Sequence, residues 1–120
     1  MPKSLLLVED DGLIRMDLAD ALSDMGFDVA EAANADEALN IFRGSLEFDG
    51  ILTDIDMPGS MNGIALAHQI ASQDAQCRII IISGRYHPGQ GKLPDGASFL
   101  GKPVSQQALE AVLKEAGLSS

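Results

Sequence analysis

The stretch ILTDIDMPGSMNG, residues 51–63, decides the predicted fold. A short apolar run ends at Asp54, a second acid follows two residues later, and Pro58, Gly59 and Gly63 come next. Apolar residues bounded by turn formers are typical of a buried strand that ends in a turn. Asp54 is therefore expected at the carboxyl end of this strand, where open α/β sheets place their ligand crevice. A carboxylate there is a candidate nucleophile or metal ligand, although Asp is also common in turns for structural reasons alone.

Length and composition point to one acidic domain with an aliphatic core. The chain has 120 residues, of which 46% are hydrophobic and only 4% aromatic. The formal net charge is -10 with no basic cluster, which argues against a nucleic-acid partner. The single cysteine, Cys77, excludes an internal disulfide and fits a reducing compartment. Since no apolar run suits a signal peptide or a membrane span, we expect a cytoplasmic protein without a membrane partner.

Strands and helices are expected to alternate along the chain. Apolar runs predict strands, and apolar residues at helical spacing predict helices after the first three strands and after the last one. The predicted strands cover residues 4–8, 27–32, 50–53, 78–83 and 98–101. This alternation predicts a parallel sheet with helices on both faces. The predicted fold class is therefore α/β, with a flavodoxin-like, doubly wound sheet of five parallel strands in the order 2-1-3-4-5.

This topology brings several polar side chains to one crevice. The first and third strands are neighbours, so Glu9 and Asp10 are expected beside Asp54. Ser83 and Lys102 end strands on the other side of Asp54. Two carboxylates about 4 Å apart repel each other by about 4 kcal/mol at an effective dielectric constant of about 20, and a divalent cation would relieve that repulsion. One acid of the run after the first strand is instead expected to cap the next helix.

From end to end, the sequence resembles the response-regulator receiver domain of two-component signalling, of the single-domain, stand-alone type. The family's acidic pair matches Glu9 and Asp10 in LLLVEDD, and its phosphoacceptor aspartate matches Asp54 in ILTDIDMPG. Its hydroxyl residue matches Ser83 in IIIISG, and its lysine matches Lys102 in FLGKP. Each motif alone is weak, but their order at the expected strand ends makes the set specific.

The resemblance implies a phosphoacceptor switch that catalyses its own phosphoryl transfer and dephosphorylation, without an independent substrate. Asp54 would take a phosphoryl group from a sensor histidine kinase, a phosphotransfer protein or a small acyl phosphate. Lys102 would supply positive charge to the phosphoryl oxygens, and Ser83 a hydrogen bond. Movement of Ser83 would open a space for Phe99 and carry the signal to a downstream partner protein, which the sequence does not identify. The family also usually has a cis peptide bond at Lys102–Pro103.

The same resemblance implies a magnesium site. We expect Mg²⁺, with Mn²⁺ as an alternative, to bind the side chains of Asp10 and Asp54 and the backbone carbonyl of Asp56. Glu9 would bind the metal directly or through water. The metal would neutralise the carboxylates that a phosphoryl donor must approach.

The segment between the fourth and fifth predicted strands departs from the family pattern. It is shorter than expected, and helix-breaking residues recur through it. These are Pro88, Gly89, Gly91, Pro94 and Gly96. We therefore predict that the family's fourth helix is missing or very short, and that residues 85–95 form a mobile loop. Tyr86 and Leu93 are apolar side chains in it that a partner could bury.

Two other functions remain open. The sequence from Asp54 to Asp56 also resembles the nucleophile motif of haloacid-dehalogenase-like phosphohydrolases, although that family is longer and begins its catalytic domain with this motif. A phosphorylation-independent interaction module on the same fold is the second alternative, against which the intact acids, Ser83 and Lys102 argue. Sustained turnover of a phosphate ester would favour the hydrolase, and one phosphoryl group per chain would favour the receiver.

The predicted domain organisation is a single receiver domain over residues 1–120, with no effector domain. Such a chain is either a stand-alone receiver or a domain taken from a longer protein. A stand-alone receiver would act by binding a partner or by passing the phosphoryl group on.

Overall fold

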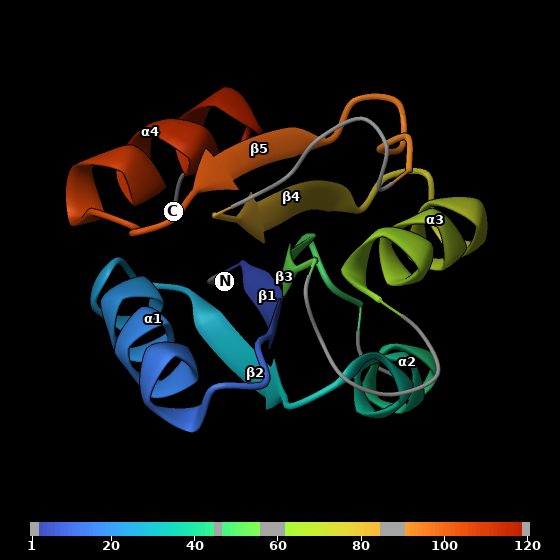
Figure 1. Ribbon diagram of the computed structural model, residues 1–120, viewed down its shortest axis with the longest axis horizontal. Coiled ribbons are helices and arrows are strands. Elements are labelled where there is room, and N and C mark those ends of the chain that lie inside the picture. The colour runs from blue at the N-terminus through green and yellow to red at the C-terminus, as the bar shows by residue number, and fades with distance from the viewer. Residues whose placement is uncertain (1–2, 45–46, 56–61, 85–90, 119–120) are drawn as a thin grey trace.

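The computed structural model, which describes residues 3–44, 47–55, 62–84 and 91–118, has a parallel sheet between two layers of helices (Figure 1). The strands are β1 (Ser4–Val8), β2 (Asp28–Ala32), β3 (Gly50–Asp54), β4 (Arg78–Ser83) and β5 (Ser98–Gly101). The helices are α1 (Gly12–Asp24), α2 (Ala35–Arg43), α3 (Gly63–Gln73) and α4 (Gln106–Glu115). The strand order is β2-β1-β3-β4-β5 and all four pairings are parallel, which confirms the predicted fold class.

The sheet is apolar on both faces because each face is covered by a helical layer. In β1, Leu6 and Val8 belong to the core under α2 and α3, whereas Leu5 and Leu7 belong to the core under α1 and α4. Successive residues of a strand point to opposite faces, so one unbroken apolar run fills both cores. Each fully buried side chain of this kind contributes roughly 1.5–3 kcal/mol to folding.

Two strand boundaries differ from the prediction by one residue. The second strand begins at Asp28 rather than at residue 27, because the amide of Phe27 donates to the carbonyl of Leu22 in α1 and not to β1. The third strand runs one residue further and includes Asp54, which pairs with Ile82 of β4. The candidate acceptor is therefore the last paired residue of a central strand, held by backbone hydrogen bonds.

Side-chain oxygens cap the starts of the helices. Asp11 accepts hydrogen bonds from the amides of Leu13 (3.0 Å) and Ile14 (3.1 Å) at the start of α1. Asn34 caps α2 and Ser105 caps α4 in the same way. Such a cap contributes about 1 kcal/mol. Because Asp11 serves the helix, Glu9 and Asp10 are the two acids of the run left to the crevice.

The described part of the connection between β4 and β5, which is Gly84 and residues 91–97, forms no helix. Residues 91–97 contain one turn at Asp95 and Gly96, and Leu93 packs against the core under α2 and α3. Over these residues the structure agrees with the prediction of a fourth helix that is missing or very short. Residues 85–90, with Tyr86, lie outside the described residues, and the predicted mobility of the loop stays a prediction. Of the helices that the structure describes, none has the length and apolarity needed to cross a bilayer.

Cys77, the residue before β4, is expected to be unreactive in the folded protein. Its side chain is buried, and burial, followed by the charges of Asp74 and Asp49, raises the pKa of the thiol to about 12. Since the thiolate is the reactive form, a disulfide-exchange reagent at about pH 8 should label the native chain very slowly and the guanidinium-unfolded chain at once. Rapid stoichiometric labelling of the native chain would contradict this burial.

Candidate functional site

Three carboxylates meet at the carboxyl ends of the two central strands. β1 and β3 pair in parallel with Val8 opposite Thr53, so Glu9 and Asp54 leave the sheet side by side. One carboxylate oxygen from each of Glu9, Asp10 and Asp54 lies within 4.8 Å of the other two. Glu9 and Asp54 are only 2% and 4% exposed, whereas Asp10 is exposed. The predicted convergence of these acids is thus present, with two of the three carboxylates largely removed from water.

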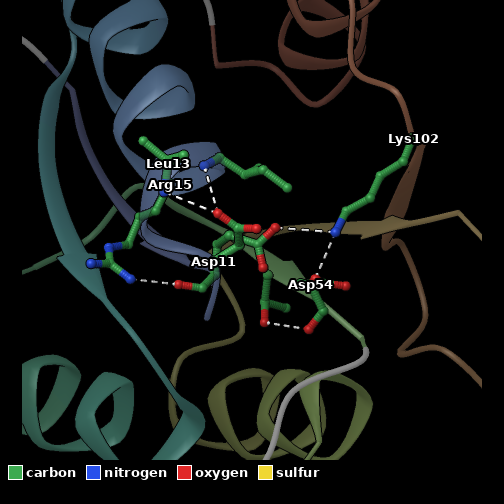
Figure 2. Close-up of polar contacts among 8 residues, drawn as sticks. Asp11, Leu13, Arg15, Asp54 and Lys102 are labelled. Atoms are coloured by element: carbon green, nitrogen blue, oxygen red, sulfur yellow. Dashed lines mark hydrogen bonds and ion pairs between the residues drawn. The ribbon is translucent and has the colours of Figure 1, made fainter.

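Lys102 bridges the two buried acids. Its Nζ lies 2.7 Å from Oδ2 of Asp54 and 3.1 Å from Oε1 of Glu9 (Figure 2). The Lys102 amide donates to the carbonyl of Ser83 (3.1 Å), and the peptide bond to Pro103 is cis, as the resemblance implies. The end of β5 is therefore held against the end of β4, and the lysine side chain extends into the crevice.

The charges of the crevice do not balance. Burial, reinforced by the neighbouring Asp54, raises the pKa of Glu9 to about 7, although the hydrogen bond from Lys102 acts in the opposite direction. Burial alone would lower the pKa of Lys102, but its hydrogen bonds to Asp54 and Glu9 outweigh burial and raise it. The lysine is therefore firmly charged, and one cation faces two buried acids and one exposed acid. The crevice has the negative excess that favours a further cation.

One buried oxygen of the crevice lacks a hydrogen-bond partner among the described residues. It is Oε2 of Glu9, whose other carboxylate oxygen accepts from Lys102. Leaving a buried acceptor unsatisfied costs about 1–3 kcal/mol, and more if it is charged. Carboxylate oxygens are the ligands that Mg²⁺ prefers, so Glu9, Asp10 and Asp54 fit this metal chemically. The predicted carbonyl ligand at Asp56 lies outside the described residues.

Ser83 and Phe99 lie on the strands beyond Asp54. Ser83 ends β4, the strand next to Asp54, and is 1% exposed. Phe99 of β5 pairs with Ile81 of β4, and its side chain is partly exposed, at 46% for the residue. The structure thus brings the Ser83 position to the acid crevice and places Phe99 near the molecular surface. Their roles in switching stay predictions.

Two further residues support the crevice without belonging to a recognised motif. Gly63, predicted only as a turn former, packs directly on the backbone carbonyl of Asp54, where a side chain has no space. Arg15 on α1 donates from Nη1 to the backbone carbonyl of Glu9 at 2.8 Å. The sequence holds a faint signal for Arg15, a cation one helical turn after the acidic run, but nothing in it identifies a carbonyl as the acceptor.

Removing the lysine is expected to destabilise the metal-free protein. The variant Lys102→Ala leaves Glu9 and Asp54 buried against each other, and losing one partner of a buried ion pair typically costs 3–5 kcal/mol. We expect about 2–3 kcal/mol near pH 7, because Lys102 is partly exposed and Glu9 can take up a proton. Magnesium should recover part of the loss. Urea unfolding tests this against the exposed-site control Lys114→Ala, and equal midpoints for all three proteins would contradict it.

Some known proteins similar to this chain match it over nearly their whole length, and in others the matching region is a small part of a longer protein. A family model described as "Response regulator receiver domain" matches residues 5–114. Chemotaxis protein CheY of Bacillus subtilis is 35% identical over 119 residues, which cover 95% of this chain and 98% of that protein. Sensor kinase CckA of Brucella abortus is 34% identical over 116 residues, which cover 93% of this chain but only 12% of the kinase.

A solved structure agrees in fold over nearly the same length. The response regulator protein TrrA of Thermotoga maritima, in complex with Mg²⁺-BeF, has a TM-score of 0.85 and 27% identity, covering 95% of this chain and 98% of that one. The homology to CheY and other response regulators is consistent with a phosphoacceptor switch and favours neither a phosphohydrolase nor a phosphorylation-independent module. The crevice, the sheet order and these likenesses together show that the chain belongs to the response regulator receiver domain family.

Proposed function

We propose that this protein is a cytoplasmic signalling switch in which Asp54 accepts a phosphoryl group from a histidine kinase or a phosphotransfer protein. The observation that supports this most strongly is the bridge from Lys102 to both Asp54 and Glu9. It holds a nucleophilic carboxylate, a second acid and a fixed positive charge together where three strands end, with Asp10 close by, and receiver domains are signalling phosphoacceptors.

The proposed reaction transfers a phosphoryl group from the donor to Asp54 when magnesium is bound at the acids of the crevice. One carboxylate oxygen of Asp54 attacks phosphorus, forming the acyl phosphate O–P bond as the bond from phosphorus to the donor breaks. The electron pair of that bond leaves with the donor imidazole or carboxylate. Lys102 already donates a hydrogen bond to Asp54, and its ammonium group can form an ion pair with the oxygens of the transferred phosphoryl group. Hydrolysis of the acyl phosphate by water returns the switch to its starting state.

The acids of the crevice would hold magnesium. Asp10 and Asp54 would bind it through their side chains and Asp56 through its carbonyl, with Glu9 binding directly or through water. When bound, the metal would neutralise the acids and offset the negative charge of the incoming phosphoryl group. The hydroxyl of Ser83 would then donate to a phosphoryl oxygen, and Phe99 would move inward as Ser83 turns. Phe99 is exposed on β5, so a change in its position would alter the surface that a partner meets.

The metal assignment predicts an order among variants. Asp10→Asn should weaken Mg²⁺ binding by roughly tenfold or more and Glu9→Gln by less, since Glu9 already shares its charge with Lys102. Titration of each variant with Mg²⁺, followed by NMR, measures the difference. Asp17→Asn, on the exposed side of α1, is the control. Equal titration curves for Asp10→Asn and wild type would refute the assignment.

A phosphorylation assay tests the proposed function. The chain is incubated with acetyl phosphate, with Mg²⁺ or with EDTA, and the products are followed by intact mass. One phosphoryl group per chain, dependent on Mg²⁺, is expected. No mass change with Mg²⁺ would refute the proposal, and sustained turnover of a generic phosphate ester would favour the phosphohydrolase.

A further inference from the structure

Arg15 connects three parts of the fold at the edge of the acid crevice. Its Nη1 donates to the backbone carbonyl of Glu9 at 2.8 Å, and its Nε lies 3.4 Å from Oε1 of Glu31 at the end of β2. The side chain is only 24% exposed. In Figure 2, Arg15 and Lys102 approach the crevice from opposite sides. One arginine therefore links α1, the loop after β1, and the edge strand β2.

The peptide groups of Glu9 are fully held by this arrangement. Its amide donates to the carbonyl of Ala32 at 3.1 Å, and its carbonyl accepts from Arg15. Its side chain is held at one oxygen by Lys102, so Oε2 alone remains without a hydrogen-bond partner among the described residues. The carbonyl of Glu9 shares a planar peptide unit with the amide of Asp10. Holding both the amide and the carbonyl of Glu9 therefore fixes the direction in which Glu9 leaves the backbone, and it fixes the position from which Asp10 starts.

We propose that Arg15 is a positioning residue for the divalent-cation site, acting through the peptide between Glu9 and Asp10 without touching the cation. The proposal rests on the metal binding that the proposed function requires. Groups that orient metal ligands typically change metal affinity by 10–100-fold when they are removed. Arg15 holds the backbone of one candidate ligand and the peptide that leads to the next.

The charge of Arg15 predicts the opposite effect from its position. An arginine next to an acidic crevice repels an incoming Mg²⁺, so its removal would tighten metal binding if charge alone mattered. If Arg15 orients the acids, its removal weakens metal binding, because the ligands lose their fixed directions. The sign of the change therefore separates the two roles.

The role of Glu31 is to help orient the guanidinium group of Arg15. It is 45% exposed, and an ion pair at such a surface contributes little to stability. The planar guanidinium can present Nε to Glu31 and Nη1 to the Glu9 carbonyl together, whereas a lysine offers one point charge. Arg15→Lys should therefore restore the charge but only part of the Mg²⁺ affinity. Glu31→Gln should weaken Mg²⁺ binding slightly.

Magnesium titration without any phosphoryl donor tests the proposal. Wild type, Arg15→Ala, Arg15→Lys and the control Arg43→Ala are titrated at constant ionic strength and followed by NMR. Arg43, on α2, donates to Gln69 at 3.3 Å and carries the same charge outside the crevice. We expect the Kd for Mg²⁺ to rise by about tenfold for Arg15→Ala and by less for Arg15→Lys, and to stay within about twofold for Arg43→Ala. Unchanged or tighter binding by folded Arg15→Ala would overturn the proposal.

Further variants and a second assay keep the test decisive. If Arg15→Ala fails to fold, Arg15→Lys and Glu31→Gln decide, and unchanged Mg²⁺ affinity in both overturns the proposal. In phosphorylation assays the Mg²⁺ concentration for half-maximal rate should rise for Arg15→Lys while the rate at saturating Mg²⁺ stays close to wild type. A wild type that binds Mg²⁺ but accepts no phosphoryl group would refute the proposed function and leave the role of Arg15 supported by the titration. A wild type that does not bind Mg²⁺ would overturn both.

Discussion

Replacing Asp54 with asparagine is expected to abolish phosphorylation of this protein. An amide keeps the size of the carboxylate but is a poor nucleophile, so the acyl phosphate cannot form. The fold should persist, because Asp54 ends β3 in backbone pairing with Ile82 and its carbonyl still accepts from the hydroxyl of Thr53 at 3.1 Å. Intact mass after incubation with acetyl phosphate and Mg²⁺ should show only unmodified Asp54→Asn.

Asp20→Asn is the matched control for this loss. Asp20 is exposed on α1, away from the three acids of the crevice, and loses the same charge on substitution. It should be phosphorylated like wild type. If Asp54→Asn acquires a phosphoryl group at the wild-type rate, another residue is the acceptor and the assignment of Asp54 is wrong.

The second large effect is expected at Gly63, the first residue of α3. A Cβ atom at this position would overlap the carbonyl oxygen of Asp54 and lie 2.7 Å from its carbonyl carbon and 3.0 Å from Cα of Ile55. All three are backbone atoms, which cannot rotate away as a side chain can. Gly63→Ala should therefore push α3 away from the end of β3. We expect a loss of about 3 kcal/mol or more in the free energy of unfolding.

Gly12→Ala is the matched control for the glycine prediction, since Gly12 is the first residue of α1. The nearest atom to a Cβ there is the side-chain Nη2 of Arg15 at 3.9 Å, an ordinary contact. Alanine favours a helix over glycine by up to about 1 kcal/mol, so Gly12→Ala should be neutral or slightly stabilising. Denaturant unfolding measures both variants. Equal stability of Gly63→Ala and wild type would show that α3 does not pack on the Asp54 carbonyl as described.

The fold could be predicted because local patterns and topology agree. The apolar runs are long enough to be buried on both faces, and the caps at Asp11, Asn34 and Ser105 mark three of the helix starts. Right-handed crossovers leave few topologies, and the order β2-β1-β3-β4-β5 is the flavodoxin-like one among them. The one-residue error at β2 arose because Phe27 continues the apolar alternation of the strand, although its amide donates to Leu22 of α1.

The crevice was predictable for the same reason, but its supports were not. Asp54 ends β3, and Glu9 and Lys102 directly follow β1 and β5, so topology alone brings them together. The close packing of Gly63 on the Asp54 carbonyl and the hydrogen bond from Arg15 to the Glu9 carbonyl depend on the distances between packed elements. Sequence spacing does not encode these distances. The bridge from Lys102 to both buried acids is likewise a matter of side-chain conformation rather than of pattern.

The position of the phosphoryl group on the chain tests the central claim most directly. Wild type is treated with acetyl phosphate and Mg²⁺, and one half of the sample is exposed to hydroxylamine, which cleaves acyl phosphates but spares phosphoserine. The other half is reduced with borohydride, digested and sequenced by mass spectrometry. The proposal predicts a hydroxylamine-labile phosphoryl group on Asp54 alone. A hydroxylamine-resistant group, or one located on Ser83 or any other residue, would contradict it.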